Sequence, residues 1–184
     1  YNERVRLNGQ ELEDHYHVAA FDALEKGRGD ISMTYFEFGT LCALEIFRHT
    51  QPDFILLEVG LGGRLDATNI VTPIASVITT IDLDHKEYLG DTRELVGFEK
   101  AGIFRATTPA IVGDLAIPVS ILNHAKAIGA NLCLAQQDFN LSQSESGYVW
   151  QSGDKKITFT QPAIPAQNVS TAAGLLQKEF DKTR

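Results

Sequence analysis

The chain has 184 residues, of which 43% are apolar and 22% are charged, as is usual for a globular protein with a core of its own. Its net charge of -8 and pI near 5.1 argue against nucleic acid or an anionic membrane as the main partner. No apolar run approaches the roughly 20 residues of a membrane helix, and the charged first residues do not look like a signal peptide, so we expect a cytoplasmic protein. Cys42 and Cys133 lack metal-ligand spacing and are expected to be buried free thiols.

Apolar periodicity predicts two helices near the start of the chain, over residues 14–26 and about 35–49. Asp14 is expected to cap the first helix, and Ser32 or Thr34 the second. The expected apolar side of the first helix consists of Val18, Phe21, Ala23 and Leu24. The two histidines beside Tyr16 stand at a polar helix start, so we expect both to be solvated; they are His15 and His17.

Short apolar strands and helices alternate through the middle of the chain, which predicts a parallel sheet with right-handed crossovers. The expected strands cover residues 54–58, 74–81, 109–113 and 131–134, and the expected helices cover about 92–104 and 118–128. From residue 138 the pattern changes to a hairpin over 148–151 and 156–160, followed by a last helix over 168–180. The predicted fold is therefore α/β, with a mostly parallel sheet flanked by helices and a small antiparallel ribbon near the C-terminus.

A glycine-rich polar loop follows the first predicted strand. Glu58 ends that strand, where a buried carboxylate is costly unless a cation meets it. The segment Gly60-Leu61-Gly62-Gly63 lets the backbone turn sharply and approach a ligand closely. This layout is typical of a ligand site at the carboxyl edge of an α/β sheet. A dinucleotide oxidoreductase is only a weak alternative, because Leu65 stands where that fingerprint needs its third glycine.

Two further side chains, His85 and Lys100, could carry chemistry with Glu58 near this edge. The carboxyl ends of neighbouring parallel strands lie about 5 Å apart, so Glu58 and His85 can meet if their strands are adjacent. A carboxylate and an imidazole suit a divalent cation, with phosphate oxygens and water completing its shell; the alternative is an ion pair or a capped strand end. Lys100 lies in a mostly apolar helix, where it is either buried and paired or modified, or else a surface lysine beside Glu99.

Several segments resemble the signature elements of the folylpolyglutamate synthase and dihydrofolate synthase family, ATP-dependent amide ligases of the Mur ligase superfamily. These segments, in chain order, are residues 1–9, 34–40, 57–69, 83–90 and 99–105. Their order and spacing agree with the family through about residue 113, and Gln167-Asn168 resembles the opening of a later helix.

The resemblance implies a specific reaction. ATP phosphorylates the carboxylate of dihydropteroate or tetrahydrofolate to an acyl phosphate, and the amine of L-glutamate then forms an amide and releases phosphate, with Mg²⁺ neutralising the phosphate oxygens. It implies that Glu58, His85 and Lys100 are catalytic, with Glu58 and His85 binding Mg²⁺ and Lys100 joining them if it is carbamylated. The implied binding residues are Asn168 near the adenine, and Phe36, Asp66 and Ala67 in the pterin pocket.

The match covers only part of what the family contains. The family has its phosphate-binding loop and folate loop ahead of the part that matches Tyr1, and a glutamate-binding domain beyond the part that matches Arg184. No G-x-x-x-x-G-K-[ST] motif occurs in the chain. We therefore expect residues 1–184 to be a single incomplete Mur-type central domain that is inactive alone and exposes a sheet edge, while the intact enzyme is a monomer acting on small molecules. The alternatives are a non-catalytic α/β binding fragment or a Mur-type ligase for another carboxylate.

Overall fold

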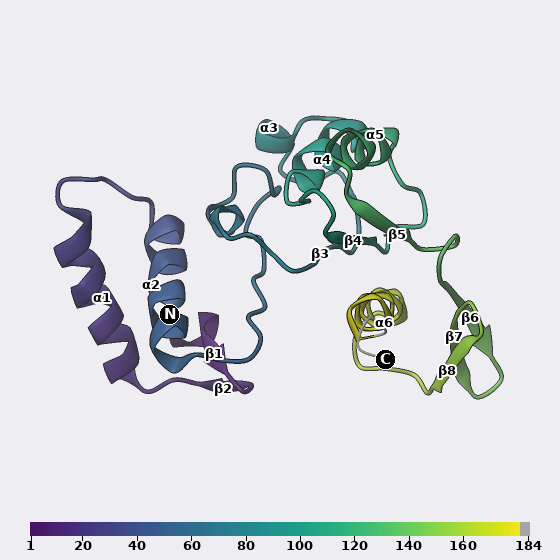
Figure 1. Cartoon of the computed structure of the whole chain (residues 1–184), viewed down its shortest axis with the longest axis horizontal. Coiled ribbons are helices and arrows are strands. Elements are labelled where there is room, and N and C mark those ends of the chain that lie inside the picture. The colour runs from purple at the N-terminus through teal and green to yellow at the C-terminus, as the bar shows by residue number, and fades with distance from the viewer. Residues whose placement is uncertain (181–184) are drawn as a thin grey trace. The chain divides into compact units, whose positions relative to one another are not determined.

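The computed structural model describes residues 1–180 and shows two compact units (Figure 1). The first unit comprises residues 1–60 and 66–70. The second comprises residues 61–65 and the described chain from residue 71 to residue 180. The glycine-rich loop predicted as the ligand site therefore contributes residues to both units.

The first unit is built on two long helices that pack against each other (Figure 1). Its elements are η1 (Asn2–Arg4), β1 (Arg6–Leu7), β2 (Gln10–Glu11), α1 (Asp14–Arg28), α2 (Tyr35–Thr50) and η2 (Ala67–Ile70). Thr34 caps α2, because its hydroxyl accepts from the Glu37 amide at 3.2 Å while the Glu37 carboxylate accepts from the Thr34 amide at 2.7 Å. Both predicted helices are confirmed within two residues, although Glu13, not Asp14, is the N-cap of α1.

The expected inner face of α1 is wrong in part. His17 is only 3% exposed, whereas Val18 is 54% exposed. The buried side of α1 follows the helical spacing i, i+3, i+4, i+7 from His17, and its other members are Ala20, Phe21 and Leu24. Val18 and Ala23 lie off this stripe and are exposed, so their apolar character does not bury them. The side chain of His15 is 65% exposed, as expected.

The strand expected over residues 54–58 does not form. This segment has no strand assignment, and Leu56 is 93% exposed and Phe54 68% exposed. An apolar run becomes a buried strand only when neighbouring strands supply a ladder on its edges. The sheets of the described residues are made by other segments.

The second unit contains a parallel sheet with the strand order β3-β4-β5. The strands are β3 (Ser76–Ile78), β4 (Pro109–Val112) and β5 (Asn131–Leu134), and the helices beside them are α3 (Lys86–Leu89), α4 (Arg93–Ala101), α5 (Val119–Ile128) and α6 (Ala166–Phe180). Side chains alternate between its two faces, so that Ile78, Val112 and Leu134 join the core with α4 and α5. On the opposite face Ile111 and Cys133 join the core with α6 (Figure 1).

An antiparallel sheet of three strands completes the second unit, in the order β6 (Asn140–Ser144), β7 (Gly147–Ser152) and β8 (Lys155–Phe159). The predicted hairpin corresponds to β7 and β8. The first strand was not predicted, because Asn140–Ser144 is mostly polar and lacks the β-branched alternation of a half-buried strand. The α/β fold class with a mostly parallel sheet and an antiparallel ribbon is confirmed.

The remaining bounds differ from expectation in two places, of which the first is the helix expected over about 92–104, since α4 ends at Ala101. The strand expected over 74–81 is confined to Ser76–Ile78, because only these residues are in register with β4. The amide of Ile81 binds the carboxylate of Asp114 instead of a strand neighbour. Cys42 and Cys133 are both free and buried, as predicted. Within residues 1–180, no helix combines the length and apolarity needed to cross a membrane.

Candidate functional site

Asp66 organises the part of the glycine loop that belongs to the first unit. Its carboxylate accepts hydrogen bonds from the Gly60 amide at 3.0 Å, the Thr68 amide at 2.9 Å and the Thr68 hydroxyl at 2.6 Å. The Phe36 ring lies directly against Gly60, where an added Cβ would stand 2.6 Å from the ring atom Cζ. Phe36 and Asp66 thus both contact Gly60, and Ala67 begins the turn η2. Their binding of a pterin remains a prediction.

Arg64 anchors the other part of the loop to the end of α4. Its backbone amide donates to the Glu99 carbonyl at 2.8 Å, and its guanidinium Nε and Nη2 donate to Glu99 Oε1 at 3.1 Å and 2.9 Å. The guanidinium also lies over the Phe98 ring, 5.7 Å from its centroid. Lys100 is the residue after Glu99 and is half-buried, between the two environments that its sequence context allowed. The contacts of Arg64 with Glu99 and Phe98 therefore fix the loop against the turn of α4 that carries Lys100.

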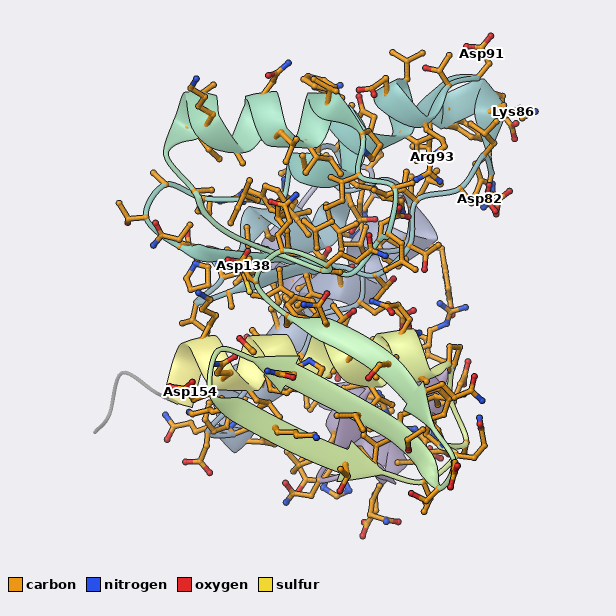
Figure 2. The ribbon with its side chains drawn as sticks, turned by 90° about the vertical axis from the view of Figure 1, so that its right-hand side faces the viewer. Asp82, Lys86, Asp91, Arg93, Asp138 and Asp154 are labelled. Atoms are coloured by element: carbon orange, nitrogen blue, oxygen red, sulfur yellow. The ribbon has the colours of Figure 1, made fainter. Side chains whose placement is uncertain are left out.

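His85 is held in a backbone conformation that few residues adopt. Its φ of 48° lies in the left-handed region, directly ahead of α3. Its amide donates to Asp84 Oδ1 at 2.7 Å, and its ring atom Nε2 lies 3.7 Å from Asp84 Oδ2. The His85 side chain is 54% exposed, so its imidazole is accessible to a ligand. Figure 2 shows the neighbouring Asp82 and Lys86 at the same end of the second unit.

The donor types of the predicted magnesium site suit the ion, since Glu58 supplies a carboxylate and His85 an imidazole. Glu58 is exposed in the first unit, whereas His85 and Lys100 belong to the second. Among residues 1–180, no three or more His, Cys, Asp or Glu side chains gather as a ready-made metal site. The joint site of Glu58, His85 and Lys100 therefore remains a prediction.

Asn168, the predicted adenine contact, lies in the first turn of α6. Its amide donates to the Pro165 carbonyl at 2.9 Å. The neighbouring Gln167 side chain donates to the Gly113 carbonyl at 2.9 Å, which ties the start of α6 to the carboxyl end of β4. Asn168 is thereby placed at the same edge of the sheet as the loops that follow β3 and β4.

Sequence reasoning missed two residues at this edge, Arg93 and Asp114. Asp114 is 7% exposed and forms an ion pair with Arg93, with 2.9 Å between Arg93 Nη2 and Asp114 Oδ1. A signal was available, because Asp114 comes directly after a predicted buried strand, in the position that drew attention to Glu58. Its partner is 21 residues away in sequence and could not be read from spacing.

The chain is similar in sequence to known proteins over nearly its whole length. Over 180 residues the chain is 47% identical to the dihydrofolate synthase/folylpolyglutamate synthase of Escherichia coli, and this match covers 96% of the chain and 42% of the relative. The chain belongs to the folylpolyglutamate synthase/dihydrofolate synthase family. The Haemophilus influenzae relative is 42% identical, with 96% of the chain and 40% of the relative covered. The resemblance expected from the sequence motifs is confirmed, although no family model matches the chain.

Solved structures of family members agree closely with the fold. Escherichia coli FolC in complex with DHPP and ADP has a TM-score of 0.94 at 46% identity, with 98% of this chain and 44% of that chain covered. The Yersinia pestis bifunctional enzyme with AMPPNP and a manganese ion has a TM-score of 0.92 at 48% identity, with the same coverage. Another structure of such a bifunctional enzyme holds manganese, AMPPNP and L-glutamate. The chain thus spans less than half the length of the relatives it matches.

Proposed function

We propose that the protein containing this chain is an ATP-dependent ligase that adds L-glutamate to dihydropteroate, tetrahydrofolate or both, through an acyl phosphate. The observation that carries this proposal is the 47% identity to the Escherichia coli dihydrofolate synthase/folylpolyglutamate synthase over nearly the whole chain. Relatives bound to ADP, to AMPPNP with manganese, and to L-glutamate support ATP and L-glutamate as substrates and a divalent cation as cofactor. We place this reaction in the cytoplasm and expect the intact protein to be a monomer that acts on small molecules.

Within this proposal, each predicted site residue has a separate role. Glu58, His85 and a carbamylated Lys100 would hold Mg²⁺, which neutralises the charge that builds up on the transferred phosphoryl group. The exposed imidazole of His85 supports this assignment, as does the fixed position of the helix turn that carries Lys100. Asn168 would contact the adenine. The pterin would lie against the loop that Asp66 organises, with Phe36 and Ala67 beside it.

We also propose that residues 1–184 form one Mur-type central domain that does not ligate by itself. Phosphoryl transfer needs a cradle for the β- and γ-phosphates, and the sequence contains no G-x-x-x-x-G-K-[ST] motif to provide one. Turnover by the 184-residue chain alone, measured as ADP release with dihydropteroate and L-glutamate, would contradict this part of the proposal.

The test of the function uses the complete protein. ADP release should require dihydropteroate or tetrahydrofolate together with L-glutamate and Mg²⁺. His85→Ala should reduce turnover by at least about 100-fold, because a lost metal ligand leaves phosphate charge uncompensated. Lys100→Arg should reduce turnover to a similar extent, because arginine keeps the positive charge but forms no carbamate. The matched control is Lys126→Arg, an exposed lysine on α5, which should keep full activity.

Each of three results would contradict a part of the proposal. Full activity in Lys100→Arg would remove the carbamate from the mechanism. Turnover that needs another carboxylate in place of the pteroate or folate would move the protein to a different Mur-type ligase activity. ATP consumption that is absent under every condition would instead favour a binding role.

A further inference from the structure

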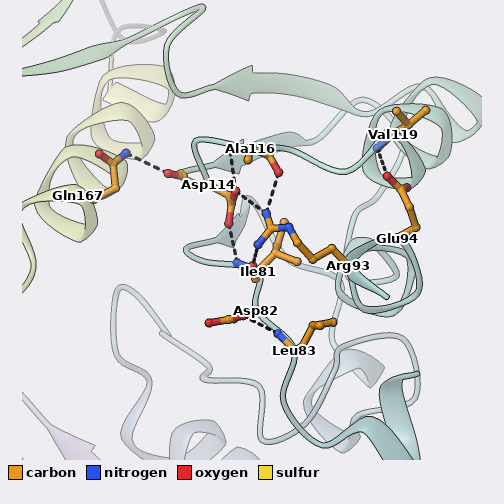
Figure 3. A network of polar contacts seen from close by, with 10 residues as sticks. Ile81, Asp82, Leu83, Arg93, Glu94, Asp114, Ala116, Val119 and Gln167 are labelled. Atoms are coloured by element: carbon orange, nitrogen blue, oxygen red, sulfur yellow. Dashed lines mark hydrogen bonds and ion pairs between the residues drawn. The ribbon is translucent and has the colours of Figure 1, made fainter. Parts of the chain in front are cut away.

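Asp114 is a buried carboxylate whose bonding is fully provided by neighbouring segments (Figure 3). Its Oδ2 accepts from the Ile81 amide at 2.7 Å, and its Oδ1 accepts from the Ala116 amide at 2.8 Å. Arg93 Nη2 adds a third donor at 2.9 Å. A carboxylate with three donors, one of them charged, is stable in a buried position.

Arg93 completes the arrangement from helix α4. Its Nη2 also donates to the Ala116 carbonyl at 2.7 Å, and its Nη1 donates to the Ile81 carbonyl. The pair therefore binds both backbone polar groups of Ile81, a residue that is 0% exposed. The forked guanidinium is needed for this, because a lysine ammonium cannot reach several acceptors in one plane.

The position of this pair in the chain gives it a consequence for the site. The β3 ladder ends at Ile78, so Ile81 is the last fixed point before the loop that leads to His85. On the other side of Asp114, the Gly113 carbonyl accepts from Gln167, the residue before Asn168. The pair thus binds the end of one segment that carries a predicted site residue, and Asp114 directly follows the residue that holds the start of the other.

We propose that Arg93 and Asp114 are positioning residues for the ligation, which fix the end of β3 so that His85 is presented to the metal, and which hold the start of α6 with Asn168 in place. This inference rests on the proposed function. The pair does not touch substrate itself. It acts through the backbone of Ile81 and Gly113, and its loss leaves the loop over residues 82–85 free to take other conformations.

The chain offers a matched control in the residue next to Arg93. Glu94 also lies in the first turn of α4 and also holds a backbone segment. Its carboxylate accepts from the Val119 amide at 3.0 Å (Figure 3) and from the Ser120 amide at 2.7 Å. These bonds support the start of α5 and not the His85 loop. Glu94→Gln therefore removes part of a comparable contact without affecting Ile81.

The experiment measures Mn²⁺ binding to the complete protein in the presence of ADP, together with hydrogen exchange of residues 82–89. Arg93→Gln and Asp114→Asn should each raise the Mn²⁺ dissociation constant about tenfold, as expected for groups that orient a metal ligand, and should speed exchange in this segment. Arg93→Lys should recover little of the loss. Glu94→Gln should change the Mn²⁺ dissociation constant by less than about twofold, even where it lowers the melting temperature as much.

The outcomes separate this inference from the proposed function. Equal effects of Arg93→Gln and Glu94→Gln on Mn²⁺ binding and on exchange would show a purely structural pair and overturn the inference. Full recovery in Arg93→Lys would overturn it too, because charge without the fork would then suffice. A wild-type protein that binds Mn²⁺ with ADP but ligates no glutamate would refute the proposed function, while the binding and exchange comparison still decides the role of the pair.

Discussion

Gly102 packs directly beneath Arg64, so closely that an added Cβ would stand 2.6 Å from the Arg64 Cα. Three residues earlier, Glu99 holds the Arg64 guanidinium and its backbone amide. Glu99 and Gly102 thus both hold the glycine loop against α4, through their contacts with Arg64. Lys100 lies between them and is placed by both.

Gly102→Ala should weaken the packing of the glycine loop against α4. The new methyl group overlaps the backbone of Arg64, and overpacking of this kind costs about 1–3 kcal/mol. Urea unfolding of the intact protein, read together with hydrogen exchange of residues 61–65, measures the effect. Gly27→Ala is the control, because Gly27 lies in α1 with open space around it and should gain up to about 1 kcal/mol of helix propensity. Equal behaviour of the two variants would contradict the close contact.

Gly60→Ala should act on the predicted pterin pocket. Its methyl group would displace the Phe36 ring from its place against the loop. We expect the KM for dihydropteroate to rise about tenfold, because small displacements of positioning groups are costly, while the KM for ATP stays unchanged. Steady-state kinetics of the intact enzyme measure both constants. An equal rise for both substrates would indicate general disruption of the fold in place of a pterin contact.

Sequence patterns predicted those elements whose signals are local. The helices α1 and α2 and the strands β4 and β5 agree with expectation within two residues, because periodicity and the Thr34 cap act within a few turns. Residues 54–58 show the limit of such signals. Their apolar character resembles a buried strand, but a strand also needs a ladder on its edges, and that depends on segments elsewhere in the chain.

In the candidate site, too, the sequence indicated residues in local motifs but not contacts between distant segments. Motif resemblance pointed to Asp66 and Phe36, and both contact Gly60. It gave no indication of the Arg93–Asp114 pair, whose members stand on separate elements and meet only in the folded chain. His17 was misjudged because the polarity of an imidazole says little about which face of a helix packs inward.

The two cysteines should be unreactive in the folded protein. Burial raises the pKa of each thiol to about 11, so at pH 8 only about one thiol in a thousand is the nucleophilic thiolate. Iodoacetamide at pH 8, followed by peptide mass spectrometry, should leave Cys42 and Cys133 unmodified. The same treatment in guanidinium should modify both. Rapid labelling of only Cys133 under native conditions would show local opening of the sheet that contains β5.

The interaction of Glu45 with Arg48 should be lost at acidic pH. Hydrogen bonds from Arg48 at 2.8 Å and 2.9 Å, and a contact with His49, lower the pKa of Glu45 from 4.5 to about 2. Because the folded pKa lies below the unfolded one, the interaction supports folding above pH 4.5 and is lost as the pH falls toward 2. Carboxyl carbon NMR should give a Glu45 midpoint near 2, and Arg48→Ala should raise it. Arg28→Ala, which breaks an ion pair on α1, should leave that midpoint unchanged, and an equal shift in both variants would mean that net charge, and not the Arg48 contact, sets it.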